Sequence, residues 1–215
     1  MGSHILLQIL VIPVIVSAIL FLGRFRFGKK AGWIAAASLV YTTMLLCKIG
    51  FSVIQGQVIK EDYFLIAPDI GFTLLADGLS LPVALIANLL CTALAFFSIH
   101  YVDHRIELLY PESDQKRWQS YYSRFFYLFL YFPVGFAGVS LVTNLLVMYF
   151  FIEVLTVTLY FLMAYFGYIN RQKIAFMCLM WGITSALLFL AGSCIIYSQT
   201  GSFSISQIHL IGGNP

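Results

Sequence analysis

Charged residues are scarce in this chain. Asp, Glu, Lys and Arg make up 10% of its 215 residues, while 61% are hydrophobic and the mean hydropathy is +0.92. Soluble globular proteins carry about 25% charged residues. The apolar residues are also gathered in runs of about twenty, the length that an α-helix needs to cross a bilayer. This composition excludes an ordinary soluble domain and favours an all-α, polytopic membrane helix bundle.

The motifs of several enzyme classes are missing as well. The sequence has no glycine-rich nucleotide loop, no HExxH zinc motif and no nucleophile elbow. Its four cysteines lie in apolar runs without CxxC spacing, so we interpret them as small buried hydrophobic residues. His100 and His104 are four residues apart, but a membrane haem needs histidines deep in two different spans. No basic tract interleaved with aromatic residues indicates nucleic-acid binding. We expect no cofactor and no metal in this chain.

The apolar runs predict six transmembrane helices in one membrane domain covering residues 1–215. Only Thr143 and Asn144 separate the fourth helix from the fifth. A single helix of about forty residues would be too long for a bilayer, and Asn is typical of turns. The first run lacks a preceding charged region, so we interpret it as a retained span rather than a signal peptide. The predicted helices are Ile5–Leu22, Gly32–Ile54, Leu79–Tyr101, Phe125–Val142, Leu145–Tyr165 and Ile174–Tyr197.

Basic residues predict the orientation of these helices. Ten of the twelve Lys and Arg residues fall in the links between the first and second, third and fourth, and fifth and sixth helices. The positive-inside rule places these links in the cytoplasm and both termini on the outer side. Residues 55–76 are then an external loop with Glu61, Asp62 and Asp69, in which a short hairpin can form. Residues 102–122 are predicted as a cytoplasmic loop with a short surface helix.

One carboxylate, Glu153, stands within the fifth predicted helix. An ionised acid at the centre of a span costs roughly 2.5–3.5 kcal/mol on insertion scales, so such acids usually mark ion or proton paths. Residues three, four and seven apart share a helix face, which joins Glu153 to Tyr149, Thr156 and Tyr160 in one polar stripe. The stripe predicts a proton relay lined by hydroxyl groups. The alternative is a protonated acid that donates one structural hydrogen bond to a neighbouring helix.

Three further polar positions are candidates for supporting roles. Asp77 opens the third predicted helix, where an N-cap is its most frequent role. Lys48 lies near the outer end of the second helix, from which a lysine can reach the interface. Ser185 and Gly192 lie on one face of the sixth helix, which we interpret as a packing face that can turn toward Glu153.

Three stretches of the sequence resemble a known family. They are LADGLSLPVALIANLL at Leu75–Leu90, the run Gly135–Tyr165 around the central glutamate, and the run from Gly167 through the sixth helix to TGSFSI at Thr200–Ile205. They are similar to the antiporter-like (Mrp-type) subunits of respiratory complex I and of membrane-bound hydrogenases. The resemblance implies the N-terminal six-helix portion of a fourteen-helix fold, which holds half of the first of two inverted repeats.

The family's ion path supplies specific expectations for this chain. The resemblance implies that Glu153 is an essential proton relay, paired with a lysine on a later, broken helix. Asp77 belongs to the DGLS motif. The family often carries a lysine early in the sixth helix, whereas this chain has Phe176, Met177 and Cys178 there, and its nearest lysine is Lys173. The later, broken helix would follow the last residue of this sequence.

The implied function is that of a membrane subunit in a redox-driven proton or sodium pump. The redox cofactors would lie in partner subunits, and this chain would carry out no redox catalysis itself. Its partners would be the lipid bilayer and other membrane subunits, including a chain or segment that supplies the later helices. The membrane would be a prokaryotic cytoplasmic membrane or an organelle inner membrane. Two alternatives stay open, a structural scaffold subunit that conducts no ions and an unrelated solute carrier.

Overall fold

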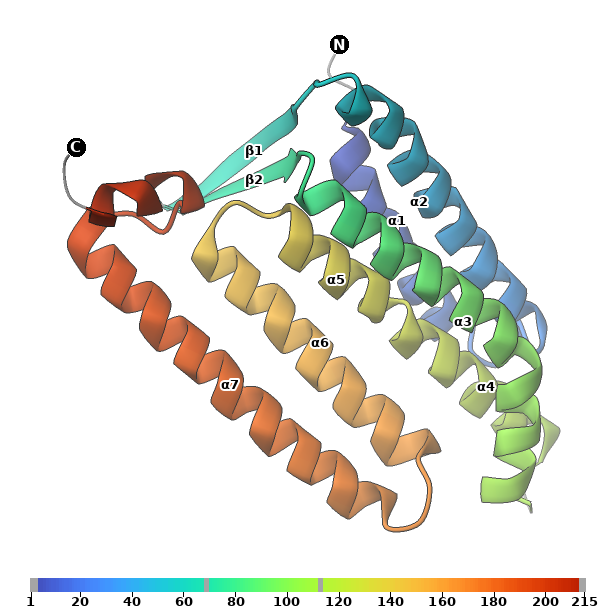
Figure 1. Ribbon diagram of the computed structural model, residues 1–215. Helices are drawn as coiled ribbons and strands as arrows, with labels where there is room; N and C mark the ends of the chain where they lie inside the picture. The colour runs from blue at the N-terminus through green and yellow to red at the C-terminus, as the bar shows by residue number, and fades with distance from the viewer. Residues whose placement is uncertain (1–3, 68–69, 112–113, 213–215) are drawn as a thin grey trace.

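A computed structural model describes residues 4–67, 70–111 and 114–212 of the chain. Within them, seven α-helices, a β-hairpin and a terminal 3-10 helix follow one another (Figure 1). Six helical stretches are long and apolar enough to cross a membrane, which confirms the predicted number of spans. The elements are α1 (Ile5–Leu22), α2 (Lys30–Ile54), β1 (Ile59–Ala67), β2 (Ile70–Ala76), α3 (Ser80–Leu109), α4 (Gln115–Phe129), α5 (Tyr131–Leu141), α6 (Leu145–Phe166), α7 (Arg171–Thr200) and η1 (Ile205–Gly212).

Helices α4 and α5 together form the fourth span, interrupted at Leu130. Pro133 follows the interruption, and its ring leaves the carbonyl four residues earlier without a backbone N–H partner. Just before the break, the hydroxyl of Ser17 on α1 donates to the carbonyl of Tyr127 over 2.8 Å. A proline and a hydroxyl from a neighbouring helix thus account for an interruption that hydropathy alone could not predict.

The link predicted as a cytoplasmic loop, residues 102–122, is mostly helical, which corrects that prediction. Helix α3 continues to Leu109 and α4 begins at Gln115, and no separate surface helix stands between them in the part that the structure describes. A hydropathy window ends where charged residues begin. Helical hydrogen bonding does not end there, because a helix can project from the bilayer into water and carry its charges with it.

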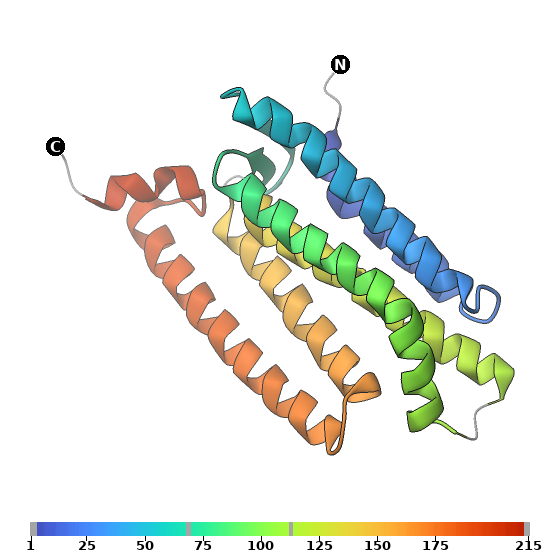
Figure 2. The same ribbon diagram turned by 45° about the vertical axis from the view of Figure 1, so that its right-hand side comes forward.

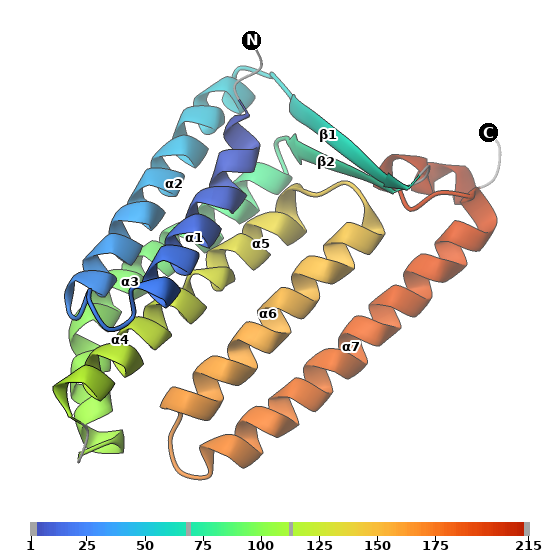
Figure 3. The same cartoon turned by 180° about the vertical axis from the view of Figure 1, so that it is seen from behind.

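The predicted external loop holds the β-hairpin. Strands β1 and β2 pair in antiparallel fashion, with Ile59 opposite Ala76. Asp69 lies outside the described residues. The hairpin stands at the end of the bundle where α1 begins and where η1 lies. The links α1–α2, α3–α4 and α6–α7 stand at the opposite end, as the predicted alternation of basic links requires (Figure 3).

Helices α1 to α5 pack into a bundle, and α6 and α7 extend from it as a thin layer (Figures 1 and 2). One hydrophobic core joins α1, α2, α3, α5 and α6 near the hairpin, and a second joins α1 to α4 and the end of α6 near the basic links. Helix α7 buries only Ala175, Ala186 and Ser193 of its 30 residues. One long face of the molecule is therefore apolar and open.

Backbone hydrogen bonds fix the turn between α5 and α6. Thr143 donates its N–H to the carbonyl of Thr73 on β2 (3.2 Å), and its own carbonyl accepts from Ile205 (2.9 Å). The Oδ1 atom of Asn144 accepts from the N–H groups of Leu146 and Val147 at 3.0 and 3.3 Å. This N-cap confirms the turn predicted at these residues.

Small residues allow α5, α6 and α7 to approach closely. A Cβ atom placed on Gly138 of α5 would collide with the buried ring of Phe151 on α6, and one placed on Gly182 of α7 would collide with Thr156 of α6. Close approach at small residues is typical of helix packing in membranes. These contacts determine which faces of α6 are covered by its neighbours.

We predict that Gly138→Ala lowers the stability of the folded chain by about 1–3 kcal/mol, because the Phe151 ring would have to leave its position. Thermal unfolding in detergent measures the change. Gly192→Ala is the matched control, since a Cβ there meets no atom within 4 Å and alanine favours a helix over glycine. Equal unfolding temperatures for the two variants would contradict the packing described here.

Candidate functional site

Glu153 lies on α6, about 12 Å along the helix from its first residue. The side chain is half-buried and lines an open groove of about 360 Å³. Across the groove stand Leu128 of α4 and Tyr131 of α5, and the remaining lining comes from α6 itself. The carboxylate therefore faces an apolar groove at the edge of the bundle rather than an enclosed interior.

The residues of the polar stripe predicted around Glu153 have different neighbours. Tyr149 lies one turn away and directs its hydroxyl to the Glu153 carboxylate. Thr156 instead packs against Gly182 of α7, and its hydroxyl donates to the carbonyl of Ile152 over 3.1 Å. Of the predicted stripe, Tyr149 is thus the residue whose hydroxyl group contacts the acid. Helix spacing placed these residues near one another but could not show which neighbour each one meets.

Tyr160 and Ser185 contact groups other than the carboxylate. The Tyr160 ring packs against Phe161, with ring centroids 5.3 Å apart. The exposed hydroxyl of Ser185 donates to carbonyls of its own helix, those of Trp181 and Gly182. Trp181 is 74% exposed. Gly182 and Ala186 lie on the face of α7 that packs on α6, so Ser185 and Trp181 stand outside that contact, and a packing role for Ser185 stays a prediction.

No cation accompanies Glu153 among the residues that the structure describes. Their ion pairs within 4 Å are Lys29–Asp103, Lys60–Asp62 and His104–Glu107, all outside this groove. Lys173 is exposed at the start of α7, beyond the far end of α6, and Lys48 is exposed on α2. Glu153 thus forms no ion pair within the described residues.

Asp77 caps helix α3, as its position predicts. Its Oδ1 accepts from the N–H groups of Leu79 and Ser80 at 3.0 and 2.8 Å, and the hydroxyl of Ser80 accepts from the Asp77 N–H at 3.0 Å. The hydrogen bond from the Ser80 backbone is the main cause that lowers the pKa of Asp77 below its ordinary value. This geometry supplies a structural reason for the acid at the start of the DGLS segment.

A second acidic residue caps a helix, and the sequence did not predict it. The Glu61 carboxylate on β1 accepts from the N–H groups of Ile5, Leu6 and Leu7 at 2.9, 3.1 and 3.3 Å, and the Tyr63 hydroxyl also donates to it. It thereby satisfies the first free N–H groups of α1. Because the partners are more than fifty residues apart, no local pattern could reveal this contact.

A polar cluster between α2 and α3 was also missed. The amide of Asn88 donates to Thr42 at 3.1 Å and to Thr43 at 2.8 Å, and Thr43 and Thr92 share a hydrogen bond of 3.0 Å. Asn88 and Thr42 are buried. An asparagine inside an apolar run was the available signal. Because its hydrogen bonds are made within the cluster, we interpret it as a clamp between the two helices.

Comparison with known proteins agrees with this architecture. Residues 142–214, about a third of the chain, match the family described as NADH:quinone oxidoreductase/Mrp antiporter, TM. The mnhA2 protein of Staphylococcus aureus (strain MRSA252), named as an antiporter subunit, is 29% identical over 212 residues. That alignment covers 95% of this chain and 24% of the relative. The mnhA2 protein of Staphylococcus epidermidis is 27% identical over 186 residues, covering 85% of this chain and 22% of the relative.

Two solved structures share the fold. A chain of the Mrp complex from Dietzia sp. DQ12-45-1b superposes with a TM-score of 0.75 at 20% identity, over 94% of this chain and 20% of that one. A chain of the membrane-bound sulfane sulfur reductase, an archaeal respiratory membrane complex, gives 0.68 at 22% identity, over 94% of this chain and 29% of that one. The chain thus spans about a quarter of the curated relatives that it matches. Sequence and fold together confirm the resemblance to antiporter-like membrane subunits.

We predict that Asp77→Ala lowers stability by about 1 kcal/mol, whereas Asp77→Asn costs less because its amide oxygen can still accept both N–H groups. The pKa of Asp77 is lowered on folding, so its ionised form stabilises the fold above the ordinary pKa, and this contribution is lost as the pH falls below about 4. Unfolding measured at neutral and at acidic pH should show that acid lowers the stability of Asp77→Asn less than that of the unaltered chain. A variant that is fully stable but inactive in ion transport would instead give the Asp77 charge a role in conduction.

Proposed function

We propose that this chain, an antiporter-like membrane subunit of the Mrp and complex I type, contributes Glu153 to a proton or sodium translocation path. The observation that carries the proposal is a carboxylate within the apolar helix α6, half-buried in a groove and contacted by the Tyr149 hydroxyl. Ionisable groups at such depth usually belong to ion or proton paths. The described residues hold no catalytic constellation, so the proposed role is translocation rather than bond chemistry.

The proposed relay depends on a cation that approaches and leaves Glu153. A nearby cation favours the charged form of a carboxyl group, and its withdrawal in apolar surroundings favours proton uptake. The cation would come from helices beyond those described or from another subunit. The exposed apolar side chains of α7, which include Phe176, Met180 and Leu188, form a surface on which such helices can pack. We accordingly propose that the chain works within a multi-subunit membrane complex and not as a free monomer.

Two sources of driving energy fit this role, and each has a specific observation in its favour. The curated relatives are named as antiporter subunits, and one solved neighbour belongs to an Mrp complex, which favours exchange of one ion for another. The other neighbour belongs to a respiratory complex, which favours a redox-driven pump with its redox cofactors in partner subunits. We infer that this chain plays the same part in either case, because Glu153 responds to a cation and not to electrons.

The proposed orientation follows from the basic end of the molecule. The positive-inside rule would place the α1–α2, α3–α4 and α6–α7 links in the cytoplasm and the β-hairpin outside. A prokaryotic cytoplasmic membrane accords with the bacterial and archaeal sources of these similar proteins.

A scaffold that conducts no ions is the second candidate. The observation in its favour is that no Lys or Arg of the described chain lies within 4 Å of Glu153. The likeness to Mrp and sulfane sulfur reductase chains argues against an unrelated solute carrier. Mutation of the carboxylate discriminates between a relay and a scaffold.

We predict that Glu153→Gln lowers ion translocation by the assembled complex on the order of tenfold to a hundredfold, because the amide cannot take up or release a proton. Ion uptake into vesicles carrying the complex measures the effect. Assembly should change little, since glutamine keeps the size of the side chain.

Glu107→Gln is the control, because that carboxylate is exposed at the basic end of α3 and lies outside the groove. Glu153→Asp should retain part of the activity. Normal translocation by Glu153→Gln in a fully assembled complex would favour the scaffold.

A further inference from the structure

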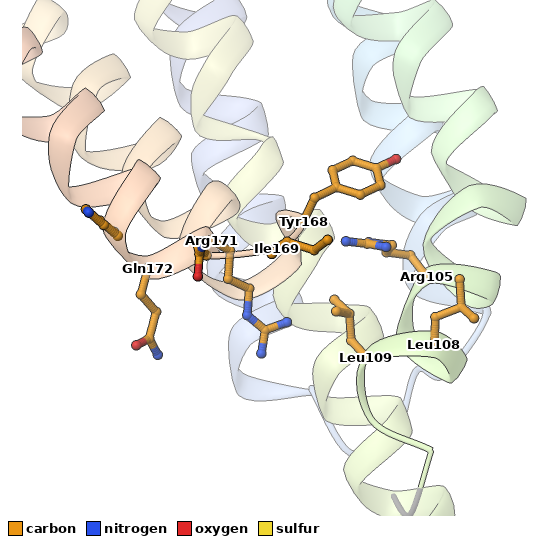
Figure 4. A pocket seen from close by; sticks show the side chains of 9 residues that line it. Arg105, Leu108, Leu109, Tyr168, Ile169, Arg171 and Gln172 are labelled. Carbon is orange, nitrogen blue, oxygen red and sulfur yellow. The ribbon is translucent and has the colours of Figure 1, made fainter.

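We propose that an anionic phospholipid binds at the basic end of the molecule, with its headgroup beside the α6–α7 turn and an acyl chain in the groove between α3 and α6. The inference requires only that the six helices span a membrane, so it can fail while the proposed ion path holds. A cavity of about 650 Å³ lies where α3 ends and α7 begins (Figure 4). The residues that line it are Arg105, Leu108, Leu109, Tyr168, Ile169, Asn170, Arg171, Gln172 and Lys173.

This cavity is cationic. Three of its lining side chains carry a positive charge, Arg105, Arg171 and Lys173, and no carboxylate is among the lining residues that the structure describes. The start of α7 adds the partial positive charge of a helix N-terminus. Basic pockets between transmembrane helices bind anionic lipid headgroups. A phosphate group is therefore the ligand chemistry that the charges favour.

Arg105 is held firmly at the wall of this cavity. It is only 9% exposed, its Nε and Nη2 donate to the carbonyls of Phe166 and Gly167 at 3.1 and 2.6 Å, and its guanidinium lies 4.0 Å from the ring centroid of Tyr168. The Arg105 guanidinium thus caps the carbonyl oxygens at the end of α6 and lies against an aromatic face. They leave the positive charge without a counter-ion among the described residues.

Arg171 is incompletely satisfied. Its Nη2 donates to the Tyr110 hydroxyl at 3.4 Å, whereas its Nη1 is screened from solvent and has no hydrogen-bond partner among the described residues. An unpaired buried donor is costly. A phosphate oxygen would relieve it, provided that the side chain turns toward the opening of the cavity.

A second, apolar groove identifies the ligand as a lipid rather than a free phosphate. It has a volume of about 800 Å³ and runs along α3 from Val83 to Tyr101, opposite Phe125, Phe132 and other residues of α4, α5 and α6. From Val83 to Tyr101 the helix rises by about 27 Å, which exceeds the roughly 15 Å of one bilayer leaflet. A whole acyl chain can therefore lie in it.

The two hollows meet at a pair of tyrosines. Tyr101 lines the apolar groove, Tyr168 lines the cationic cavity, and their hydroxyl groups share a hydrogen bond of 2.9 Å. Tyr168 and Ile169 are 69% and 86% exposed, as side chains at a lipid interface can be. The cationic cavity, the two tyrosines and the apolar groove thus follow one another in the same order as the headgroup, glycerol and acyl chain of a phospholipid.

The test compares two double variants of the full chain, purified with whatever subunits accompany it. Arg171→Gln with Lys173→Gln removes two charges from the cavity. Lys116→Gln with Arg117→Gln removes two exposed charges from α4 at the same end of the molecule, outside the cavity. We expect phosphatidylglycerol to be retained roughly tenfold less by the first variant and nearly normally by the second. Native mass spectrometry of samples from phosphatidylglycerol nanodiscs, with phosphatidylcholine nanodiscs as reference, measures this retention.

Equal losses in the two variants would overturn the site, because they would show a general attraction of surface charge. Protection against thermal unfolding by inorganic phosphate, as strong as that by phosphatidylglycerol, would assign the cavity to a free anion instead. The unaltered chain provides an independent measurement that does not depend on variant folding. A photoactivatable acyl chain on phosphatidylglycerol should label residues of the α3–α6 groove, and labelling of a partner protein helix there, or of other faces only, would overturn the proposal.

Discussion

The position of Glu153 depends on a three-residue interruption of the helical chain. Val142, Thr143 and Asn144 separate α5 from α6, and buried backbone groups next to a helix end must find hydrogen-bond partners within the protein. Here the partners come from β2, from the segment before η1 and from the Asn144 side chain. Because this turn is held from both sides, α6 starts at a fixed depth, and Glu153 follows about two turns later.

Long-range capping recurs at other helix ends. Glu61 of the hairpin caps the start of α1, and Arg105 of α3 caps the end of α6. Each cap joins elements that are distant in sequence, so it fixes a helix end and the arrangement of the bundle together. The hairpin accordingly acts as a structural element at its end of the molecule, since it contacts α1 through Glu61 and the α5–α6 turn through Thr73. No sheet stands at the basic end among the described residues, and Arg105 caps a helix end there instead.

The α6–α7 layer explains why the candidate site is open. Contacts at Gly138 and Gly182 cover two faces of α6, and the face that carries Glu153 is left to a groove. An acid in an open apolar groove is a poor arrangement for a solitary protein, because the membrane offers it no counter-charge. The arrangement is consistent with a subunit whose neighbours pack over the groove and supply a cation. The same openness between α3 and α6 gives lipid access to the second groove.

The sequence by itself determined the number of spans, their approximate limits, the alternation of basic links and the presence of one acid within a span, because hydropathy and charge act locally along the chain. It also predicted a turn at Asn144 and a helix cap at Asp77, because turns and caps depend on neighbouring residues in the chain. Only the tertiary structure decided that Thr156 faces α7 while Glu153 faces a groove, that Ser185 points outward, and that Glu61 and Arg105 close helix ends. Those outcomes depend on contacts between residues that are far apart in the sequence. Helix periodicity shows which residues share a face, but it does not show which neighbour covers that face.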